Sequence, residues 1–536
     1  MTACDVSSSV AGMRGINEEG ARMVRSATPV ELPVDSVDDP PEVIDVLVVG
    51  AGFGGLGTAI RLKQAGIDDF VVLDRAEDIG GTWRVNTYPG AQCDIPSILY
   101  SFSFAPNPNW TRLYPLQQEI HDYLRACTEN FGIVPHLRMG HDVRDATWDD
   151  DSQVWHVTTS RGTWEARILV GAMGPFSEPA VPNLPGLASF RGAVFHSAAW
   201  DHEHDLAGER VAVIGTGASA VQIIPRIQPI VGSMTVFQRT PTWILPHPDQ
   251  PMTGWPRKLF ARVPVAQRLA RTGLDLVQEA MVPGFVYKPA LLKGLAALGR
   301  AHLRRQIHNP ELRTKLTPTY AFGCKRPTFS NSFYPALAQP NVDVVTDGIR
   351  EVRSNGIVTE DGALHEVDTI VLGTGFRLTD NPAFDVVRGR DGRTLAEAWN
   401  GNARAYLGTT ISGFPNFFML LGPNSVVYTS QVVTIEAQIA YILSCLQEMN
   451  AQGAASIDVR PEVQQAFVDE VDKRLQTSVW NTGGCTSYYL SGEGRNFTFY
   501  PGFNRRFRAR TRRADLDQYI LSGVGASAKS TVRTAG

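Results

Sequence analysis

The chain has 536 residues, more than a single hydrophobic core usually serves, so two or more structural units are expected. Hydrophobic residues make up 43% of the sequence and charged residues 19%, which is typical of a globular protein. A formal net charge of -4 offers no broadly basic surface, so a nucleic-acid partner is not expected.

The cysteines are scattered, with no CxxC pair and no histidine at metal-ligand spacing. They are Cys4, Cys93, Cys127, Cys324, Cys445 and Cys485. This pattern predicts neither a disulfide scaffold nor a metal site, and it favours a reducing, cytoplasmic location.

Targeting and membrane signals are not found in the sequence. No stretch approaches the roughly 20 apolar residues that a membrane span needs, so no integral membrane association is expected. Residues 1–42 are polar and end in an Asp-Asp-Pro-Pro run, which predicts a mobile N-terminal arm.

The first recognisable unit is a strand, a glycine turn and a helix. Residues 43–49 form an apolar run that stops at Gly50, Gly52 and Gly55, the glycines of a dinucleotide-binding turn. Glycine permits the tight bend, the approach of backbone to a pyrophosphate and close packing of helix on strand. A second strand ends at Asp74, whose carboxylate is placed to accept hydrogen bonds from a ribose diol. We assign this first site to FAD.

The same succession recurs after a strand at residues 210–214. The third turn position is Ala220, which the fingerprint allows. At the end of the next strand Arg239 replaces the expected acid, and arginine pairs with a 2′-phosphate that a carboxylate would repel. The second nucleotide is therefore predicted to be NADPH. The residues of this predicted site are Gly215, Thr216, Gly217, Ala218, Ser219, Arg239 and Thr240.

Two further strand-and-glycine segments, near residues 170 and 372, are expected to be the crossings between the two units. Residues 43–175 and 376–536 would then form an FAD domain, and residues 176–375 an NADP domain inserted in it. The predicted fold class is α/β, with two Rossmann-like dinucleotide-binding domains and a helical insertion.

Three segments have more than one interpretation. The helical insertion, at about 255–315, is rich in Leu, Ala, Arg and Lys; we favour packing over a substrate cleft, although such a helix can also lie on a membrane. The arginines of 505–513 are expected to form a solvated or salt-bridged face rather than a nucleic-acid site. The aromatic residues of 480–489 border a substrate pocket or simply pack in the core.

Two dinucleotide folds also occur in disulfide reductases, which need a redox cysteine pair in the first domain. Cys93 has no nearby partner in the sequence. Electrons delivered to a flavin must leave by another route, and O2 is the obvious acceptor.

Residues 190–201 match the FxGxxxHxxxW pattern of type I Baeyer–Villiger monooxygenases, just before the second glycine turn. The chain resembles that family over about residues 43–510. In the family, His196 would act in domain linkage and cofactor movement. The related N- and S-oxidising flavin monooxygenases carry another aromatic residue at Trp200, so Trp200 followed by Asp201 favours the Baeyer–Villiger branch.

The resemblance also implies roles for individual residues. Trp83, Asp94 and Tyr100 match flavin-contacting positions. Lys325 would help to bind the 2′-phosphate, and Arg326 would reach the reactive face of the flavin. Independently of the family, charge that develops on a peroxide and then on a tetrahedral adduct needs a fixed cation, and a guanidinium stays ionised. Asp94 would hold Arg326 in orientation.

The implied reaction begins with hydride transfer from NADPH to FAD and addition of O2 to give a C4a-peroxyflavin. This species attacks a ketone, Arg326 stabilises the adduct, and an ester or lactone results. The alternatives are an N- or S-oxygenating flavin monooxygenase and a flavoprotein that binds both nucleotides without catalysis. Neither the ketone nor the oligomeric state is predicted.

Overall fold

The computed structural model describes residues 43–252 and 254–523, and the predicted arm at 1–42 lies outside them. Its largest sheet has eight strands in the order β17-β4-β5-β6-β1-β2-β3, with β18 also paired to β6. The strands are β1 (Val43–Val49), β2 (Phe70–Asp74), β3 (Leu137–Met139), β4 (Val143–Asp149), β5 (Val154–Thr159), β6 (Gly162–Gly171), β17 (Val387–Arg388) and β18 (Phe417–Met419). The central pairings of β1 with β2 and β6 are parallel. Because β1 is buried on both faces, its sequence is a nearly continuous apolar run.

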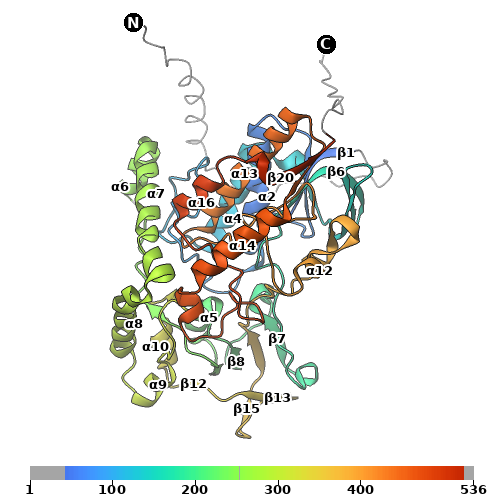
Figure 1. Cartoon of the computed structure of the whole chain (residues 1–536). Helices are drawn as coiled ribbons and strands as arrows, with labels where there is room; N and C mark the ends of the chain where they lie inside the picture. The colour runs from blue at the N-terminus through green and yellow to red at the C-terminus, as the bar shows by residue number, and fades with distance from the viewer. Residues whose placement is uncertain (1–42, 253, 524–536) are drawn as a thin grey trace.

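A second sheet has five strands, and every pairing in it is parallel. The order is β12-β9-β8-β16-β7, from β7 (Ala193–His196), β8 (Arg210–Ile214), β9 (Ser233–Phe237), β12 (Val342–Val345) and β16 (Thr369–Leu372). Figure 1 shows this sheet below the first one. A small antiparallel sheet continues beyond it, made of β13 (Ile349–Arg353), β14 (Gly356–Thr359) and β15 (Leu364–Glu366). The first sheet is mixed, because β4–β5 and β5–β6 pair antiparallel, but its centre is parallel, and the second sheet is parallel throughout. Both sheets carry a glycine turn, and together they confirm the predicted α/β fold class.

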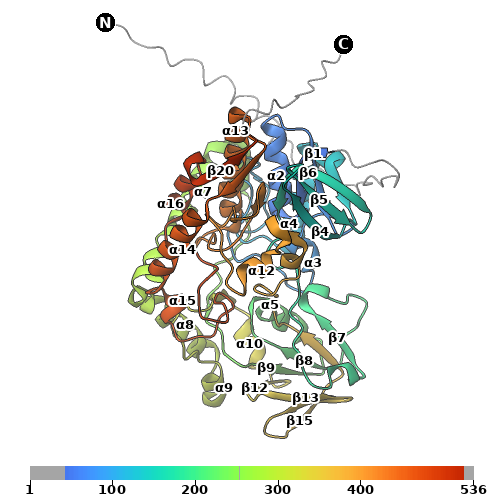
Figure 2. The ribbon, with the colours of Figure 1, turned by 45° about the vertical axis from the view of Figure 1, so that its right-hand side comes forward.

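The main core lies between the first sheet and the helices that cover it. Helix α2 (Phe53–Gln64) follows the first glycine turn and packs against α13 (Gln431–Gln452). A Cβ atom at Gly57 would lie 2.8 Å from the ring of Phe102 and 3.1 Å from Ile439, so glycine permits this close approach. Figure 2 shows α14 (Pro461–Leu475) and α16 (Asn504–Arg510) beyond α13 on the same side. The last third of the chain thus completes the unit that the first third begins.

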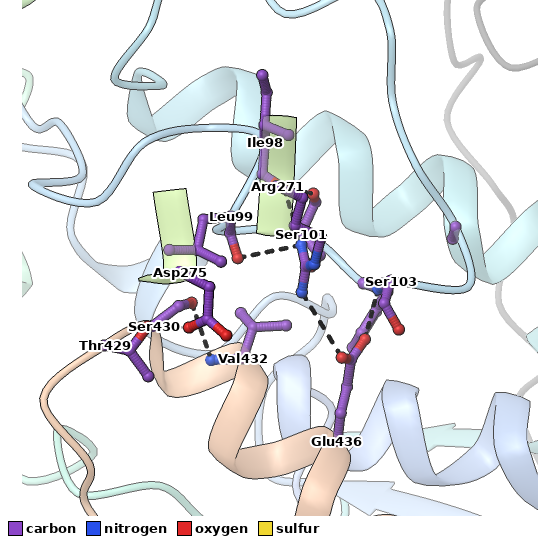
Figure 3. Close-up of polar contacts among 12 residues, drawn as sticks. Ile98, Leu99, Ser101, Ser103, Arg271, Asp275, Thr429, Ser430, Val432 and Glu436 are labelled. Atoms are coloured by element: carbon purple, nitrogen blue, oxygen red, sulfur yellow. Dashed lines mark hydrogen bonds and ion pairs between the residues drawn. The ribbon is translucent and has the colours of Figure 1, made fainter. Parts of the chain in front are cut away.

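Residues 255–315 are largely helical, as expected. The helices are α6 (Trp255–Arg262), α7 (Pro264–Glu279), α8 (Lys293–Gln306) and α9 (Pro310–Lys315). Helix α7 lies against the unit of the first sheet: the Arg271 guanidinium donates to the carbonyl oxygens of Ile98 (2.8 Å) and Ser101 (2.8 Å). Figure 3 shows this guanidinium between the loop that contains Ile98 and Ser101 and the Glu436 side chain of α13. The distance from the guanidinium to the Glu436 carboxylate is 3.6 Å. Within 43–252 and 254–523, no helix is both long and apolar enough to cross a bilayer.

Candidate active site

The first glycine turn has the geometry of a nucleotide cradle. Gly50 has φ +110°, and a Cβ atom there would lie 2.5 Å from the carbonyl oxygen of Ala172. A Cβ atom at Gly55 would lie 1.7 Å from the carbonyl oxygen of Gly50, which no side chain can tolerate. Gly52 precedes α2, and that helix begins with no side-chain cap, so its first N–H groups are available to a phosphate.

A cavity of about 490 Å³ opens beside this turn, lined by residues that include Gly50, Asp74 and Met173. The Asp74 carboxylate accepts hydrogen bonds from the backbone N–H groups of Ala51 (2.6 Å) and Ala76 (2.9 Å). A carboxylate has about four lone-pair sites, so Asp74 can still accept from a ribose diol. The turn, the open helix end and the carboxylate fit a dinucleotide such as FAD.

The second glycine turn repeats this arrangement at the end of β8, the central strand of the second sheet. Gly215 has φ +109°, and a Cβ atom there would lie 2.4 Å from the carbonyl oxygen of Gly373. Gly217 faces open space, with no atom within 4 Å of a Cβ position. Helix α5 (Ala218–Ile227), which includes the predicted Ser219, begins directly after it, and the Thr216 hydroxyl donates to the Thr240 carbonyl oxygen at 3.2 Å. The backbone at Gly217 is therefore open to the close approach of a ligand.

Two cationic side chains from separate segments, Arg239 and Lys325, lie close together. Burial, and then the positive charge of Arg239, lower the pKa of Lys325 below its ordinary value. The Lys325 Nζ also lies 5.5 Å from the centre of the Tyr320 ring. A phosphate dianion would relieve the repulsion between these cations, as a 2′-phosphate site requires.

The predicted flavin-contacting residues come together in the structure. The Trp83 indole N–H donates to the Tyr100 hydroxyl at 3.1 Å, and the two rings meet edge to face at 5.6 Å. Burial raises the pKa of Tyr100, and the negative charge of Asp94 adds to this effect. Trp83 and Tyr100 are therefore in direct contact, and Asp94, the partner of Arg326, lies near enough for its charge to influence Tyr100.

Arg326 and Asp94 form a two-pronged ion pair. The Arg326 Nε donates to Asp94 Oδ2 at 2.7 Å, and Nη2 donates to Oδ1 at 2.8 Å. The side chains remain 40% and 27% exposed, so the pair faces open space rather than lying sealed in the core. The negative charge of Asp94 raises the pKa of Arg326 well above its ordinary value, so the guanidinium stays charged. These facts match the orienting contact predicted for Asp94.

Two tyrosines lie near Arg326: Tyr489, from the aromatic segment 480–489, and Tyr428, which was not assigned from the sequence. The hydroxyls of Tyr428 and Tyr489 lie near enough for their charges to influence the pKa of Arg326. Tyr428 stacks on Phe285 of the helical segment, with ring centres 3.8 Å apart. Trp480 stacks on Phe499 at 3.7 Å and is only 2% exposed, so it belongs to the core. Tyr428 follows residues 413–425, a segment that also resembles type I Baeyer–Villiger monooxygenases in sequence, and this resemblance is the signal that could have identified it.

A disulfide joins Cys324 to Cys485 across 161 residues. The prediction of no disulfide was wrong for this pair, because two distant segments meet in the fold and their spacing gives no sign of it. The bond ties the segment that precedes Arg326 to the loop that carries Tyr489. Among the described cysteines, Cys93, Cys127 and Cys445 are free and buried.

The 190–201 motif packs at a crossing between the two sheets. The His196 Nδ1 accepts the backbone N–H of Ala198 at 3.0 Å, and its ring meets Phe376 edge to face at 5.8 Å. Burial lowers the pKa of His196. Phe195 packs edge to face against Trp200 at 5.0 Å. The contacts of His196 are to the crossing segment, which agrees with a role in linkage.

Gln92 and Gln222 connect the two units directly. The Gln222 side chain donates to the Gln92 carbonyl oxygen at 2.8 Å and accepts from the Tyr88 hydroxyl at 3.0 Å. The Gln92 side chain donates to Asp249 at 2.9 Å, and Asp249 also accepts from Arg112 at 2.7 Å. Gln222 and Asp249 had no sequence signal of their own.

Comparisons with known proteins agree with this geometry. A family model described as pyridine nucleotide-disulphide oxidoreductase matches residues 47–253. A protein of Streptomyces coelicolor named Baeyer-Villiger monooxygenase is 48% identical over 480 residues, 89% of this chain and 92% of its own length. A Pseudomonas aeruginosa protein of the same name is 46% identical over 488 residues, 90% of this chain and 93% of its own length.

Solved structures give the same result. Cyclohexanone monooxygenase from Rhodococcus sp. Phi1 bound to NADP+ matches with a TM-score of 0.81 and 30% identity, over 90% of this chain and 100% of that chain. An oxidized steroid monooxygenase bound to NADP matches with a TM-score of 0.80 and 31% identity, over 90% of this chain and 100% of that chain. The identity to the named relatives and its extent show that this chain belongs to the Baeyer–Villiger monooxygenase family.

Proposed function

We propose that the protein uses FAD, NADPH and O2 to oxidise a ketone to an ester or lactone. The observation that carries this proposal is the two-pronged Arg326–Asp94 pair, which presents a permanent cation among aromatic side chains. The two glycine turns, and the cavity of about 490 Å³ beside the first of them, support the cofactor assignment. The family membership and the NADP named in two matching structures support the reaction class.

FAD would be held by the first glycine turn, Asp74 and the cluster of Trp83 and Tyr100. NADPH would be held by the second turn, with Arg239 and Lys325 at its 2′-phosphate. When bound, the flavin would supply the hydride-accepting and oxygen-activating chemistry that protein side chains lack. The chain's own residues bind, orient and stabilise charge.

Arg326 would stabilise the negative charge that develops on the substrate oxygen. Its charge-assisted donors are fixed before reaction because Asp94 accepts from Nε and Nη2. Tyr428 and Tyr489 would limit water near that charge, which strengthens each electrostatic interaction. No side chain is required as a covalent nucleophile.

We also propose the domain division 43–175 with 376–536 for FAD and 176–375 for NADP. It is supported by the pairing of β17 and β18 with strands of the first third of the chain. The pairing of β16 with β7 and β8 supports the inserted NADP domain. Helix α7 packs against the FAD side, so the helical segment would connect both domains.

The test is a substrate panel on the FAD-loaded enzyme. Linear, cyclic and aryl ketones are assayed beside thioethers and amines, with NADPH oxidation and product formation measured together. The proposal predicts ester or lactone in proportion to NADPH consumed for at least one ketone class. Oxidation of heteroatoms alone, or no NADPH consumption with any ketone, would contradict it.

A further inference from the structure

Helix α7 is turned inside out relative to an ordinary surface helix. Its buried residues are the polar Gln267 and Glu279, only 4% and 5% exposed. Several of its apolar residues point outward, since Leu269 is 68% exposed, Leu276 53% and Val277 67%, whereas Leu274 packs against the main core. Residues spaced by three, four or seven positions share one helix face, so the leucines form an exposed stripe.

Polar contacts hold α7 in this orientation. Asp275 accepts hydrogen bonds from the Thr429 hydroxyl at 2.9 Å and from Asn504 at 3.1 Å. Glu279 accepts the backbone N–H of Arg505 at 2.7 Å. Rotating the helix to bury Leu269 and Leu276 would leave these carboxylates without their partners, and the cost of unpaired buried carboxylates opposes the gain from burying apolar surface. The outward stripe is therefore a fixed feature of the surface.

The surroundings of the stripe are aromatic and basic. Trp255, at the start of α6, is 74% exposed, and α6 also exposes Lys258 and Arg262. The acidic residues of α6 and α7 are Asp275 and Glu279, both engaged on the inner face. Figure 1 shows α6 and α7 forming one edge of the molecule. Contiguous exposed apolar surface of this kind marks an interaction site.

The neighbouring helix α16 adds further positive charge. It lies beside α7 through the Asn504 and Arg505 contacts; the Arg505 side chain is 72% exposed, with its Nε 4.0 Å from the Glu279 carboxylate. Arg510 and Arg513 pair with Glu470 and Glu448, as the sequence led us to expect for this run.

We propose that the face of α6 and α7, with Trp255, Leu269 and Leu276 at its centre, docks on an anionic phospholipid surface. Interfacial helices combine an apolar stripe with Lys and Arg and an interfacial tryptophan, and this face has all three. A second copy of the chain fits less well, because a two-fold interface would set the same basic residues against each other. The protein would lie on the membrane without crossing it, and would meet apolar ketones there.

The test is co-sedimentation of the full-length, FAD-loaded protein with vesicles of phosphatidylcholine alone or mixed with phosphatidylglycerol. Binding is expected only with the anionic lipid, and weaker binding as salt increases. The double variant Leu269→Ser/Leu276→Ser should reduce the partition coefficient at least tenfold. Replacing Lys258 and Arg262 by glutamine should weaken it by about fivefold per charge.

The matched control is Ile230→Ser/Leu364→Ser, since these residues are 51% and 41% exposed on other elements. It should bind vesicles as the unsubstituted chain does. Equal thermal stability and flavin content of all variants show that folding is intact. The proposal would be overturned if the unsubstituted protein did not bind anionic vesicles. It would also be overturned if the leucine variant and the glutamine variant both bound them as strongly as the unsubstituted protein does. A dimer in sedimentation equilibrium that the leucine substitutions dissociate would also overturn it, in favour of a second copy.

Discussion

Replacing Asp94 by asparagine separates the orientation of Arg326 from its charge. The carboxylate accepts two charge-assisted hydrogen bonds, at 2.7 and 2.8 Å. An amide at the same place offers one acceptor oxygen and sets its NH2 donor against a guanidinium donor. Arg326 keeps its positive charge, because an arginine is protonated with or without a carboxylate partner. The substitution therefore frees the cation without removing it.

The expected loss follows from the exposure of the pair. A hydrogen bond to a charged group contributes about 1.5–3 kcal/mol, and the 40% and 27% exposure of these side chains reduces that figure. Orientation worth about 1–2 kcal/mol corresponds to a decrease in kcat of about 5–30-fold. The assay is ester formation at saturating ketone and NADPH, with the hydrogen peroxide released in unproductive turnover measured beside it. The peroxide fraction should rise as ester falls.

Asp368→Asn is the matched control for this change. Arg210 donates to Asp368 through Nε (3.1 Å) and Nη2 (2.7 Å), and these side chains are 43% and 42% exposed, away from the candidate site. That variant should keep its kcat. Unchanged kcat and peroxide release in Asp94→Asn with full flavin content, or an equal loss in the control, would refute the orienting role.

Three further predictions concern the cofactor sites and the disulfide. Lys325→Ala should raise the KM for NADPH by about ten- to a hundredfold without affecting the KM for NADH. Because burial lowers the pKa of Lys325, this side chain loses its positive charge at a lower pH than an ordinary lysine does. In the unsubstituted enzyme, the KM for NADPH should therefore begin to rise at a pH below the ordinary pKa of lysine. Gly55→Ala places a Cβ atom 1.7 Å from a turn carbonyl oxygen and should abolish flavin binding, measured by absorbance, whereas Gly294→Ala meets no atom within 4 Å and should retain it. Cys324→Ser/Cys485→Ser should lower the free energy of unfolding by about 2–4 kcal/mol; a denaturation midpoint and slope equal to those of the unsubstituted protein would contradict this.

The glycine turns could be predicted from the sequence because their chemistry is local. Gly50 and Gly215 each lie where a strand ends and the backbone adopts a positive φ. The apolar run before each glycine predicts the strand, and the glycine itself permits the positive φ. The family resemblance identified the positions of Arg326 and Asp94, and their pairing was predicted because a charge-stabilising guanidinium needs a partner that holds its orientation. The pairing joins segments 232 residues apart, which periodicity alone does not bring together.

The residues that escaped prediction depend on tertiary packing. Cys324 meets Cys485 only after both domains have folded, and the sequence interval between them carries no signal. Tyr428 is placed by its stacking on Phe285, from a helical segment whose position over the fold could not be derived. Helix α7 departs from the usual rule that apolar residues face inward, since it buries Gln267 and Glu279 and exposes Leu269 and Leu276, and the sequence did not predict which of its faces is buried.

The most direct test of the proposed function is the Arg326→Ala variant of the FAD-loaded enzyme. Ester formation from a ketone that the unsubstituted enzyme oxidises is measured together with flavin content and NADPH oxidation. Removing the charge-stabilising donor is predicted to lower the ester rate by at least about 10²–10³-fold while flavin remains bound. Ester formation at the unsubstituted rate in a fully flavin-loaded Arg326→Ala protein would contradict the central claim.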